Sequence, residues 1–284
     1  MYKFPIGVMM ESFLLPVDEC IKKAVAMGAA GFQMYATTGE HAPENMTPAK
    51  IAELKDKMSS NGLVFSALCG DLGRGFGHAD LNPELIEKSK RILDLAKELG
   101  TDIVTTHIGV VPSDPTIDRY KVMQEACFEL SRYADSIGSH FAIETGPEPS
   151  RVLKGFLDQL GSTGVAVNLD PANLVMVVGD TPVEAVHNLK DYIVHTHAKD
   201  GVRLKTCVPE EIYGVTPLPG AIDEGEFFFE APLGKGQVHF PSYIKALEDI
   251  GYRGFLTIER ETGADPVKDI TDAADFLRAV MAEN

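Results

Sequence analysis

Four residues that can bind a metal ion or transfer a proton end four apolar runs in the second half of the sequence: Glu144 in AIE, Asp170 in NLD, His197 in HTH and Glu259 in TIE. Carboxylates and imidazoles are ligands for divalent cations, and they are also the usual general acids and bases. The first three residues are separated by about one strand–helix unit each, and the fourth by one unit plus a longer loop. This spacing predicts four neighbouring strands that each carry one polar residue at the same end.

The residues around each of the four positions fit strands buried on both faces. Side chains two apart share one face of a strand, so the residue two before each ligand faces inward with it. These inward residues are Ala142, Asn168, His195 and Thr257. Three converging carboxylates repel one another unless a cation neutralises them. The sequence therefore predicts a divalent metal site, with Mn²⁺ favoured and Mg²⁺, Co²⁺ or Zn²⁺ as alternatives.

Short apolar runs alternate with longer amphipathic ones along the whole chain. The expected strands are 5–9, 31–34, 64–68, 103–107, 141–144, 165–170, 193–197 and 255–259. The expected helices are 17–27, 48–60, 83–99, 117–137, 151–160, 182–189, 242–250 and 266–281. Alternation of this kind predicts an α/β fold, a (β/α)₈ TIM barrel formed by residues 1–284 as a single domain. A doubly wound open sheet is the rival, but VMMESFLLP after the first run lacks the glycine-rich turn that it needs.

The connection from about 198 to 240, after the seventh strand, is much longer than the others. We expect it to be a lid over the active site, with a subunit contact as the alternative. Asp200 near its start either accepts from a substrate hydroxyl or caps the strand end. Glu11, after the first strand, and Gln33, in the second, are expected to line the cup.

The composition limits the classes of partner. The 284 residues carry a formal net charge of −16, which argues against binding to nucleic acid or to an anionic membrane surface. No apolar run approaches the ~20 residues of a membrane span, and no signal peptide is evident at the N-terminus. The four cysteines are widely spaced, so no disulfides are expected. We expect a cytoplasmic protein with a small-molecule substrate.

The motifs AIETG, NLDPAN, HTHAKDG, LGKGQVHF and GYRGFLTIERE resemble the xylose-isomerase-like barrel superfamily. Within it the chain is similar to the group of ketose 3-epimerases, inosose dehydratases and hydroxypyruvate isomerases. The resemblance implies the same four metal ligands, with Glu144 and Glu259 as the catalytic acid–base pair. It also implies that Arg203 and Asn173 contact the substrate, although the epimerases have histidine at the second position.

The implied function is a metal-dependent epimerase or isomerase of keto-sugars or polyols, acting by proton transfer through a metal-stabilised enediolate. Dehydration of a keto-inositol by the same fold is the alternative, and a non-catalytic sugar-binding barrel is a third hypothesis. The zinc endonucleases of the superfamily need an Asp-x-His pair that the loop after His197 lacks. His107 is therefore expected to contact substrate, and His195 to be structural. The resemblance also implies a homodimer or homotetramer.

Overall fold

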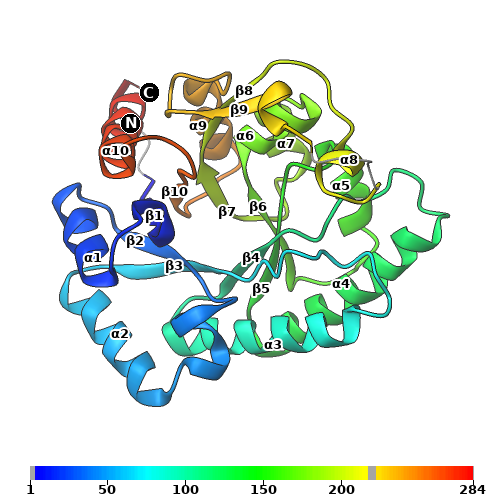
Figure 1. Cartoon of the computed structure of the whole chain (residues 1–284), viewed down its shortest axis with the longest axis horizontal. Helices are drawn as coiled ribbons and strands as arrows, with labels where there is room; N and C mark the ends of the chain where they lie inside the picture. The colour runs from blue at the N-terminus through cyan, green and yellow to red at the C-terminus, as the bar shows by residue number, and fades with distance from the viewer. Residues whose placement is uncertain (1–3, 217–221, 284) are drawn as a thin grey trace.

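Parallel strands close into a barrel in this computed structural model, which describes residues 4–216 and 222–283 (Figure 1). Within those residues the barrel has the strand order β1-β10-β7-β6-β5-β4-β3-β2. The strands are β1 (Ile6–Met9), β2 (Gly31–Tyr35), β3 (Val64–Cys69), β4 (Ile103–Thr106), β5 (His140–Glu144), β6 (Val165–Leu169), β7 (Ile193–Ala198) and β10 (Leu256–Ile258). The barrel closes where β1 pairs with β10, with Gly7 opposite Thr257. The predicted (β/α)₈ fold is confirmed.

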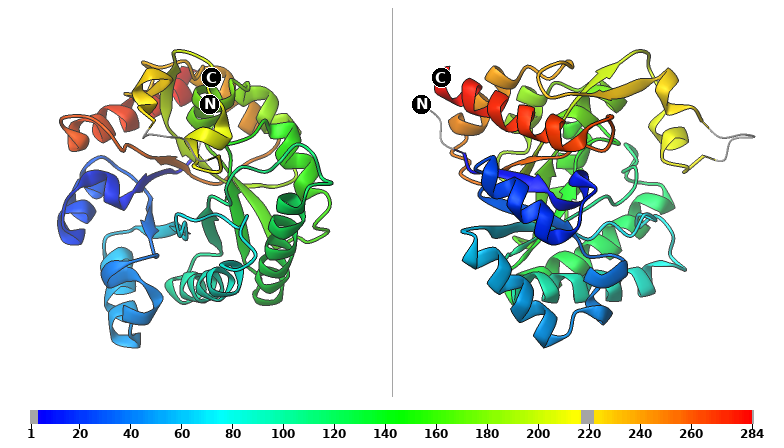
Figure 2. Two further views of the ribbon diagram at one scale, coloured as in Figure 1. Left: turned by 45° about the vertical axis from the view of Figure 1, so that its right-hand side comes forward. Right: turned by 60° about the vertical axis from the view of Figure 1, so that its left-hand side comes forward.

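Helices follow the strands and form the outer layer of the molecule (Figures 1 and 2). The main ones are α1 (Val17–Ala26), α2 (Pro48–Ser60), α3 (Asn82–Leu99), α4 (Asp118–Ile137), α5 (Ser150–Leu157), α7 (Pro182–Asn188), α9 (Phe240–Asp249) and α10 (Pro266–Glu283). Proline near the first position starts several of them, because its missing N–H has no helical partner there. Helices α3 and α4 end at Gly100 and Gly138, which adopt the left-handed conformation that glycine tolerates.

The barrel strands are buried between the barrel interior and the helices. Every residue of β6 is buried, and β1 and β10 are likewise buried along their whole length. Apolar side chains on the helix-facing side of these strands pack against the buried faces of the helices in one continuous core. Because this core encloses the barrel, the carboxyl ends of the strands are held in a fixed arrangement, as positioning of a site requires.

The connection after β7 differs from the expected loop because it contains its own two-stranded sheet. Strand β8 (Asp200–Arg203) pairs antiparallel with β9 (Phe228–Ala231). A short helix α8 (Pro209–Ile212) and a single 3₁₀ turn (Glu224–Glu226) lie between them in the chain. Figure 2 shows this ribbon extending out from the barrel. The predicted lid spans about 198–240, of which residues 217–221 lie outside the described part of the chain.

A second departure follows β6. Short helix α6 (Pro171–Asn173) continues into a π-helical turn (Leu174–Val178), where the sequence predicted no element. All four cysteines are free, as expected. In the described residues, no helix combines the length and the apolar character that crossing a membrane requires.

Candidate metal centre

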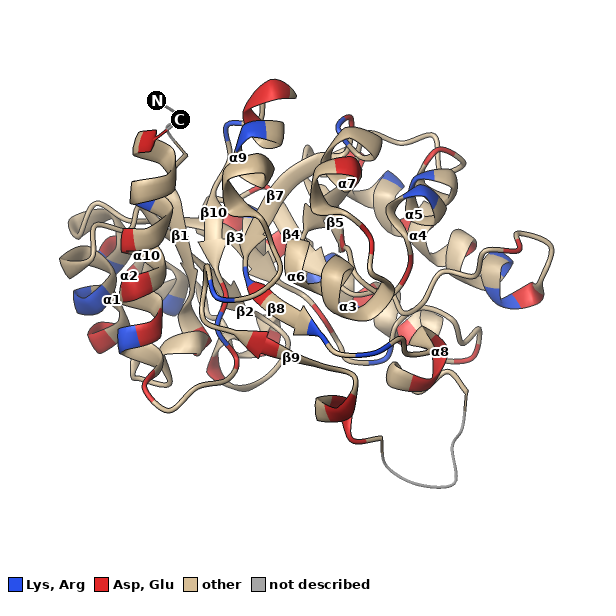
Figure 3. Ribbon diagram, turned by 90° about the horizontal axis from the view of Figure 1, so that it is seen from above, with Lys and Arg blue, Asp and Glu red and all other residues tan. Residues whose placement is uncertain are grey.

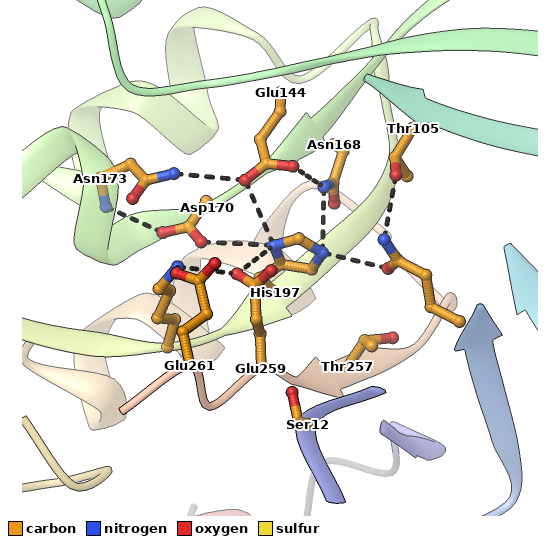
Figure 4. A network of polar contacts seen from close by, with 12 residues as sticks. Ser12, Thr105, Glu144, Asn168, Asp170, Asn173, His197, Thr257, Glu259 and Glu261 are labelled. Atoms are coloured by element: carbon orange, nitrogen blue, oxygen red, sulfur yellow. Dashed lines mark hydrogen bonds and ion pairs between the residues drawn. The ribbon is translucent and has the colours of Figure 1, made fainter. Parts of the chain in front are cut away.

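The four residues singled out in the sequence lie together at the carboxyl ends of β5, β6, β7 and β10. Glu144, Asp170, His197 and Glu259 each offer one ligand atom, and these atoms all lie within 4.8 Å of one another (Figure 4). All four side chains are buried, and Asp170 and His197 have no exposed surface. Glu144 and Glu259 come from opposite ends of an arc of four neighbouring strands. Their carboxylates therefore reach the cluster from different directions.

His197 is at the centre of the cluster. Its Nδ1 lies 3.3 Å from Asp170 Oδ2, 3.5 Å from Glu144 Oε1 and 3.2 Å from Glu259 Oε2. Its Nε2 lies 3.0 Å from Gln33 Oε1. Gln33 in turn donates from Nε2 to Thr105 Oγ1 at 2.9 Å, which leaves its Oε1 as the acceptor facing the ring. A proton on Nε2 directs the Nδ1 lone pair toward the three carboxylates, which is the orientation that a metal ligand needs.

Neutral amides hold the Glu144 carboxylate in place. Asn168 Nδ2 donates to Glu144 Oε2 at 3.1 Å, and Asn173 Nδ2 donates to Glu144 Oε1 at 3.2 Å. Asn173 also donates from its backbone N–H to Asp170 Oδ1 at 2.8 Å, so Asp170 caps α6. Gly146 has φ of +146°, and a Cβ there would lie 2.5 Å from Cβ of Asn173. Glycine in the AIETG motif therefore allows Asn173 to approach Glu144.

A cation beside Glu259 comes from Lys199, which directly follows the strand that carries His197. Lys199 Nζ, on a buried side chain, donates to Glu259 Oε2 at 3.0 Å and also to Glu261. Burial raises the pKa of Glu259, but Lys199 and His197 outweigh this and hold that pKa well below its usual range. Burial likewise lowers the pKa of His197, but Glu259 and Glu144 hold it well above its usual value. The cluster thus attracts positive charge strongly.

The donor set fits a divalent ion. Three carboxylate oxygens and one imidazole nitrogen suit cations of the Mn²⁺ and Mg²⁺ class. Buried charges require compensation, and the carboxylates of Glu144 and Asp170 receive no lysine or arginine among the described residues. A divalent cation between these oxygens would supply that compensation. The hydrogen bonds to Glu144, Asp170 and His197 would orient the ligands around it.

A cavity of about 580 Å³ opens above the cluster. Glu144 and Glu259 line it, whereas Asp170 and His197 do not. His107 follows β4 and also lines the cavity, with its Nε2 3.5 Å from Glu144 Oε1. Burial lowers the pKa of His107, but Glu144 and Asp71 outweigh this effect and raise it above its usual value. Of the residues predicted to contact substrate, His107 and Asn173 line this cavity.

The other three predicted contacts lie outside this cavity. Asp200 accepts four backbone N–H groups, those of Gly201, Gly234, Gly236 and Val238. This favours the strand-end alternative for Asp200 over contact with a substrate hydroxyl. The Arg203 side chain lies against Gly179 instead of entering the cavity. Glu11 accepts from the backbone N–H of Tyr35 at 3.0 Å and lines a smaller, adjoining cavity.

Several lining residues were not predicted, among them Tyr35 and Tyr213. Phe228 and Phe229 of β9, in the connection that was expected to form a lid or a subunit contact, also line the cavity. Glu261 also lines the cavity, and its position two residues after Glu259 in TIERE was a signal that could have identified it. Tyr213 could not have been found this way, because it reaches the site from the irregular segment after α8. The phenylalanines support a lid role for the β8–β9 ribbon. His195, by contrast, is buried as expected, with Nδ1 2.9 Å from Asn168 Oδ1.

Solved structures with the same fold include proteins of several activities. A xylose isomerase domain protein from Planctomyces limnophilus has a TM-score of 0.80 at 24% identity and covers 99% of this chain and 97% of its own. A 3-keto-D-glucoside 4-epimerase from E. coli has a TM-score of 0.72 at 17% identity, over 98% of this chain and 100% of its own. A probable 3-DHS dehydratase from Bacillus anthracis has a TM-score of 0.73 at 17% identity, over 97% and 99%. At these identities the likeness establishes the fold alone.

A family model gives the stronger result. It describes the xylose isomerase-like TIM barrel, and it matches residues 21–280, nearly the whole chain. The match includes the strands that carry all four residues of the cluster. The chain therefore belongs to the xylose isomerase-like TIM-barrel family.

Proposed function

We propose that this protein is a divalent-metal-dependent epimerase or isomerase that acts on a keto-sugar or polyol by proton transfer. The observation that carries the proposal is the convergence of Glu144, Asp170, His197 and Glu259 beneath a cavity that Glu144 and Glu259 line. A bound divalent ion, with Mn²⁺ favoured, would supply Lewis-acid polarisation of a substrate carbonyl. The protein's own side chains would carry out the proton transfer.

Two carboxylates on different sides of one cavity suit the removal and return of a proton. Glu259 has its pKa held low by Lys199 and His197 despite burial, and the pKa of Glu144 is also lowered by His197 and His107 despite burial. Both are therefore in the basic form at neutral pH. Removal of a carbon-bound proton by one and return by the other on the opposite face inverts that carbon. Return to the neighbouring carbon instead isomerises the sugar.

Contacts to the sugar hydroxyls are expected from neutral and cationic groups on the wall. Asn173 holds Glu144 with its side-chain N–H and lies at the cavity surface. His107 and Tyr213 face one another with ring centroids 6.2 Å apart. Hydroxyl-rich ligands need such paired donors and acceptors on a largely enclosed wall.

Dehydration of a keto-inositol is the second candidate, and one observation favours it. His107 lies at the cavity wall, and Glu144 and Asp71 raise its pKa despite burial, which favours the protonated imidazole. A protonated imidazole beside the substrate can protonate a departing hydroxyl after a glutamate has removed the adjacent proton. The dehydratase among the proteins of this fold is consistent with such a reaction.

Proton NMR in D₂O tests both candidates. The Mn²⁺-loaded protein is incubated with a panel of keto-sugars and keto-inositols. Deuterium incorporation with inversion or with carbonyl migration supports the epimerase or isomerase, while loss of water with a new alkene or diketone signal supports the dehydratase. Absence of exchange across the panel, in protein that holds one equivalent of metal, would overturn the proposal.

A further inference from the structure

The cavity above the cluster is poorly suited to an anionic substrate group. The carboxylates that line it are Asp71, Glu144, Glu224, Glu230, Glu259 and Glu261. Lys199 is the one lysine or arginine among the lining residues, and Glu259 and Glu261 already share it. A carboxylate or phosphate bound here would meet like charges at short range. The side chains of this cavity therefore offer no free lysine or arginine to an anionic substrate group.

A second and larger cavity adjoins the first. Its volume is about 870 Å³, and Asp71 lines both cavities. It lies between residues 36–44 of the loop after β2, the start of the loop after β3, and one side of α3. Tyr35 of the first cavity directly precedes Ala36 of the second. Either cavity alone falls in the range of ~300–1,000 Å³ that holds a drug-sized ligand. The pair offers more room than a single sugar ring needs.

The second cavity, called the arm cavity here, differs from the first in its charge. Its basic residues are Arg74, Lys88 and Arg91, and its acidic residues besides Asp71 are Glu44 and Glu84. Lys88 is already paired with Glu84 at 2.6 Å. Arg74 and Arg91 form no ion pair with any other described residue. Two guanidinium groups without an ion pair among the described residues, in a chain of net charge −16, make this cavity better suited to an anion than the first.

The loop that carries Arg74 is held in a defined conformation. Arg74 stands between Gly73 and Gly75, which have φ of +69° and +58°. Asp71 Oδ1 accepts from the N–H of Gly73 at 2.8 Å, and Phe76 donates its N–H to the carbonyl of Ile108 at 2.9 Å. A Cβ at Gly75 would lie 2.6 Å from that carbonyl oxygen, so glycine is required for this contact. The loop therefore fixes the backbone position from which the exposed Arg74 side chain lines the cavity.

The arm cavity also has apolar surface. Leu72, Leu81, Leu85 and Ile92 line it together with the two arginines. Leu81 is 39% exposed although it is a large apolar side chain. An apolar wall beside guanidinium groups fits a hydrocarbon or aromatic spacer that ends in an anionic group.

We propose that the arm cavity binds an anionic extension of the substrate, so that the substrate is a glycoside or similar sugar conjugate. Its uncharged sugar lies above Glu144 and Glu259, and an arm ending in a carboxylate or phosphate reaches Arg74 and Arg91. This inference rests on the proposed function, because it takes the first cavity as the place where the sugar reacts. It adds that recognition extends beyond the reacting ring.

Isothermal titration calorimetry on Mn²⁺-loaded protein at low ionic strength tests the arm cavity. The probes are phenyl β-D-glucopyranoside and its 4-carboxy and 4-phosphonooxy derivatives, which differ only at the far end of the arm. We expect at least one anionic probe to bind about 5- to 10-fold more tightly than the neutral one. The advantage should shrink as salt is added, because salt screens partly exposed charges.

The double variant Arg74→Gln/Arg91→Gln removes both charges with little loss of volume. It should bind all three probes with the affinity of the neutral one. Arg132→Gln/Arg253→Gln is the matched control, since both arginines are at least 60% exposed and pair elsewhere, and it changes the net charge equally. This control variant should still bind the anionic probes more tightly than the neutral one. Arg91→Gln alone, on the exposed side of α3, provides the same test with a smaller effect if the double variant does not fold.

Several results would overturn the proposal that the arm cavity binds an anionic arm. These are equal affinity for the three probes in the wild type, a preference that survives the double variant, or no measurable binding of any probe. Deuterium exchange on unextended sugars separates this failure from failure of the proposed function. Exchange without a preference for anionic probes refutes only the anion-binding role of the arm cavity. Absence of exchange refutes the proposed function.

Discussion

The clustered residues are held by neutral amide side chains and, at Glu259, by the oppositely charged Lys199. Asn168 and Asn173 donate to Glu144, and Gln33 faces His197. Replacement of a ligand carboxylate therefore changes both the charge of the cluster and its proton-transfer chemistry. A measurement of bound metal beside activity separates the two effects.

Glu144→Gln and Glu259→Gln are each expected to lower the rate of deuterium exchange by at least ~10²-fold, because acid–base groups typically contribute ~10²–10⁴-fold. Metal content by inductively coupled plasma mass spectrometry shows how much of the loss comes from the ligand role. Glu98→Gln, on exposed α3 surface, is the control. Near-full exchange activity in either ligand variant would contradict the proposed mechanism.

Glu148 predicts a dependence of stability on pH. Burial raises the pKa of Glu148 to about 8, although the N–H of Val111 donates to its carboxylate. Between about pH 4.5 and 8 the folded state thus holds a proton that the unfolded state has released, and stability falls as pH rises through this window.

Glu148→Gln removes this proton linkage. The free energy of unfolding of the variant, from urea denaturation, should fall less between pH 5 and 8 than that of the wild type. The difference should be at least ~1 kcal/mol, since one pH unit between two pKa values corresponds to about 1.4 kcal/mol. If the free energy of unfolding depended on pH equally in the wild type and the variant, Glu148 would be ionised in the folded state.

At the level of elements, the strands of the barrel were predictable and the β8–β9 ribbon was not. A run such as VAVNL of β6 is apolar, bounded by turn residues and buried throughout, so its pattern identifies it. Strands β8 and β9 have four residues each and are separated by 24 residues of the chain, too many for a short hairpin pattern to be recognised in the sequence. Their pairing depends on contacts distant in sequence, which periodicity does not encode.

The same limit explains the placement of the substrate contacts. The four cluster residues were predictable because strand register fixes them at one rim of the barrel. The side chains of Asp200 and Arg203 depend on how the ribbon packs. The donors to Asp200 include Gly234, Gly236 and Val238, more than thirty residues away, and no local pattern announces them.

Asp200→Ala should loosen the base of the ribbon. It leaves four backbone N–H groups without their carboxylate acceptor, and unsatisfied buried donors cost ~1–3 kcal/mol each before water compensates. We expect a loss of about 2–4 kcal/mol in the free energy of unfolding, together with faster proteolysis within residues 201–238.

Asp223→Ala is the matched control, because Asp223 accepts one backbone N–H in the same connection and is exposed. It should cost less than about 1 kcal/mol. Equal stability of the Asp200 and Asp223 variants would show that the carboxylate of Asp200 does not anchor the ribbon.

For the whole molecule, charge is unevenly distributed between surface and centre. Figure 3 shows acidic and basic residues interspersed on the outer helices, and an acidic residue on β9. The buried cluster adds three carboxylates that can be neutralised only locally. A cation that binds the folded state alone must stabilise it by mass action.

Adding Mn²⁺ should therefore raise the melting temperature, and chelation should lower it. When the Mn²⁺ concentration is one hundred times its dissociation constant, the free energy of unfolding should rise by about 2.7 kcal/mol. Because the pKa of His197 is raised in the free cluster, protons compete with the metal, and the gain should increase from pH 6 to pH 8. Differential scanning fluorimetry measures both trends. Asp170→Asn should lose most of the gain, and a gain of wild-type size in that variant would place the ion elsewhere.

The pairing of β1 with β10 has a consequence for synthesis of the protein. Glu259 directly follows β10, which closes the barrel against the first strand of the chain. Synthesis must therefore reach residue 259 before the fourth ligand can join the other three. A nascent chain stalled before residue 255 exposes the partner groups of β1 and holds an incomplete ligand set, so high-affinity metal capture reports that β10 has been made and has paired with β1.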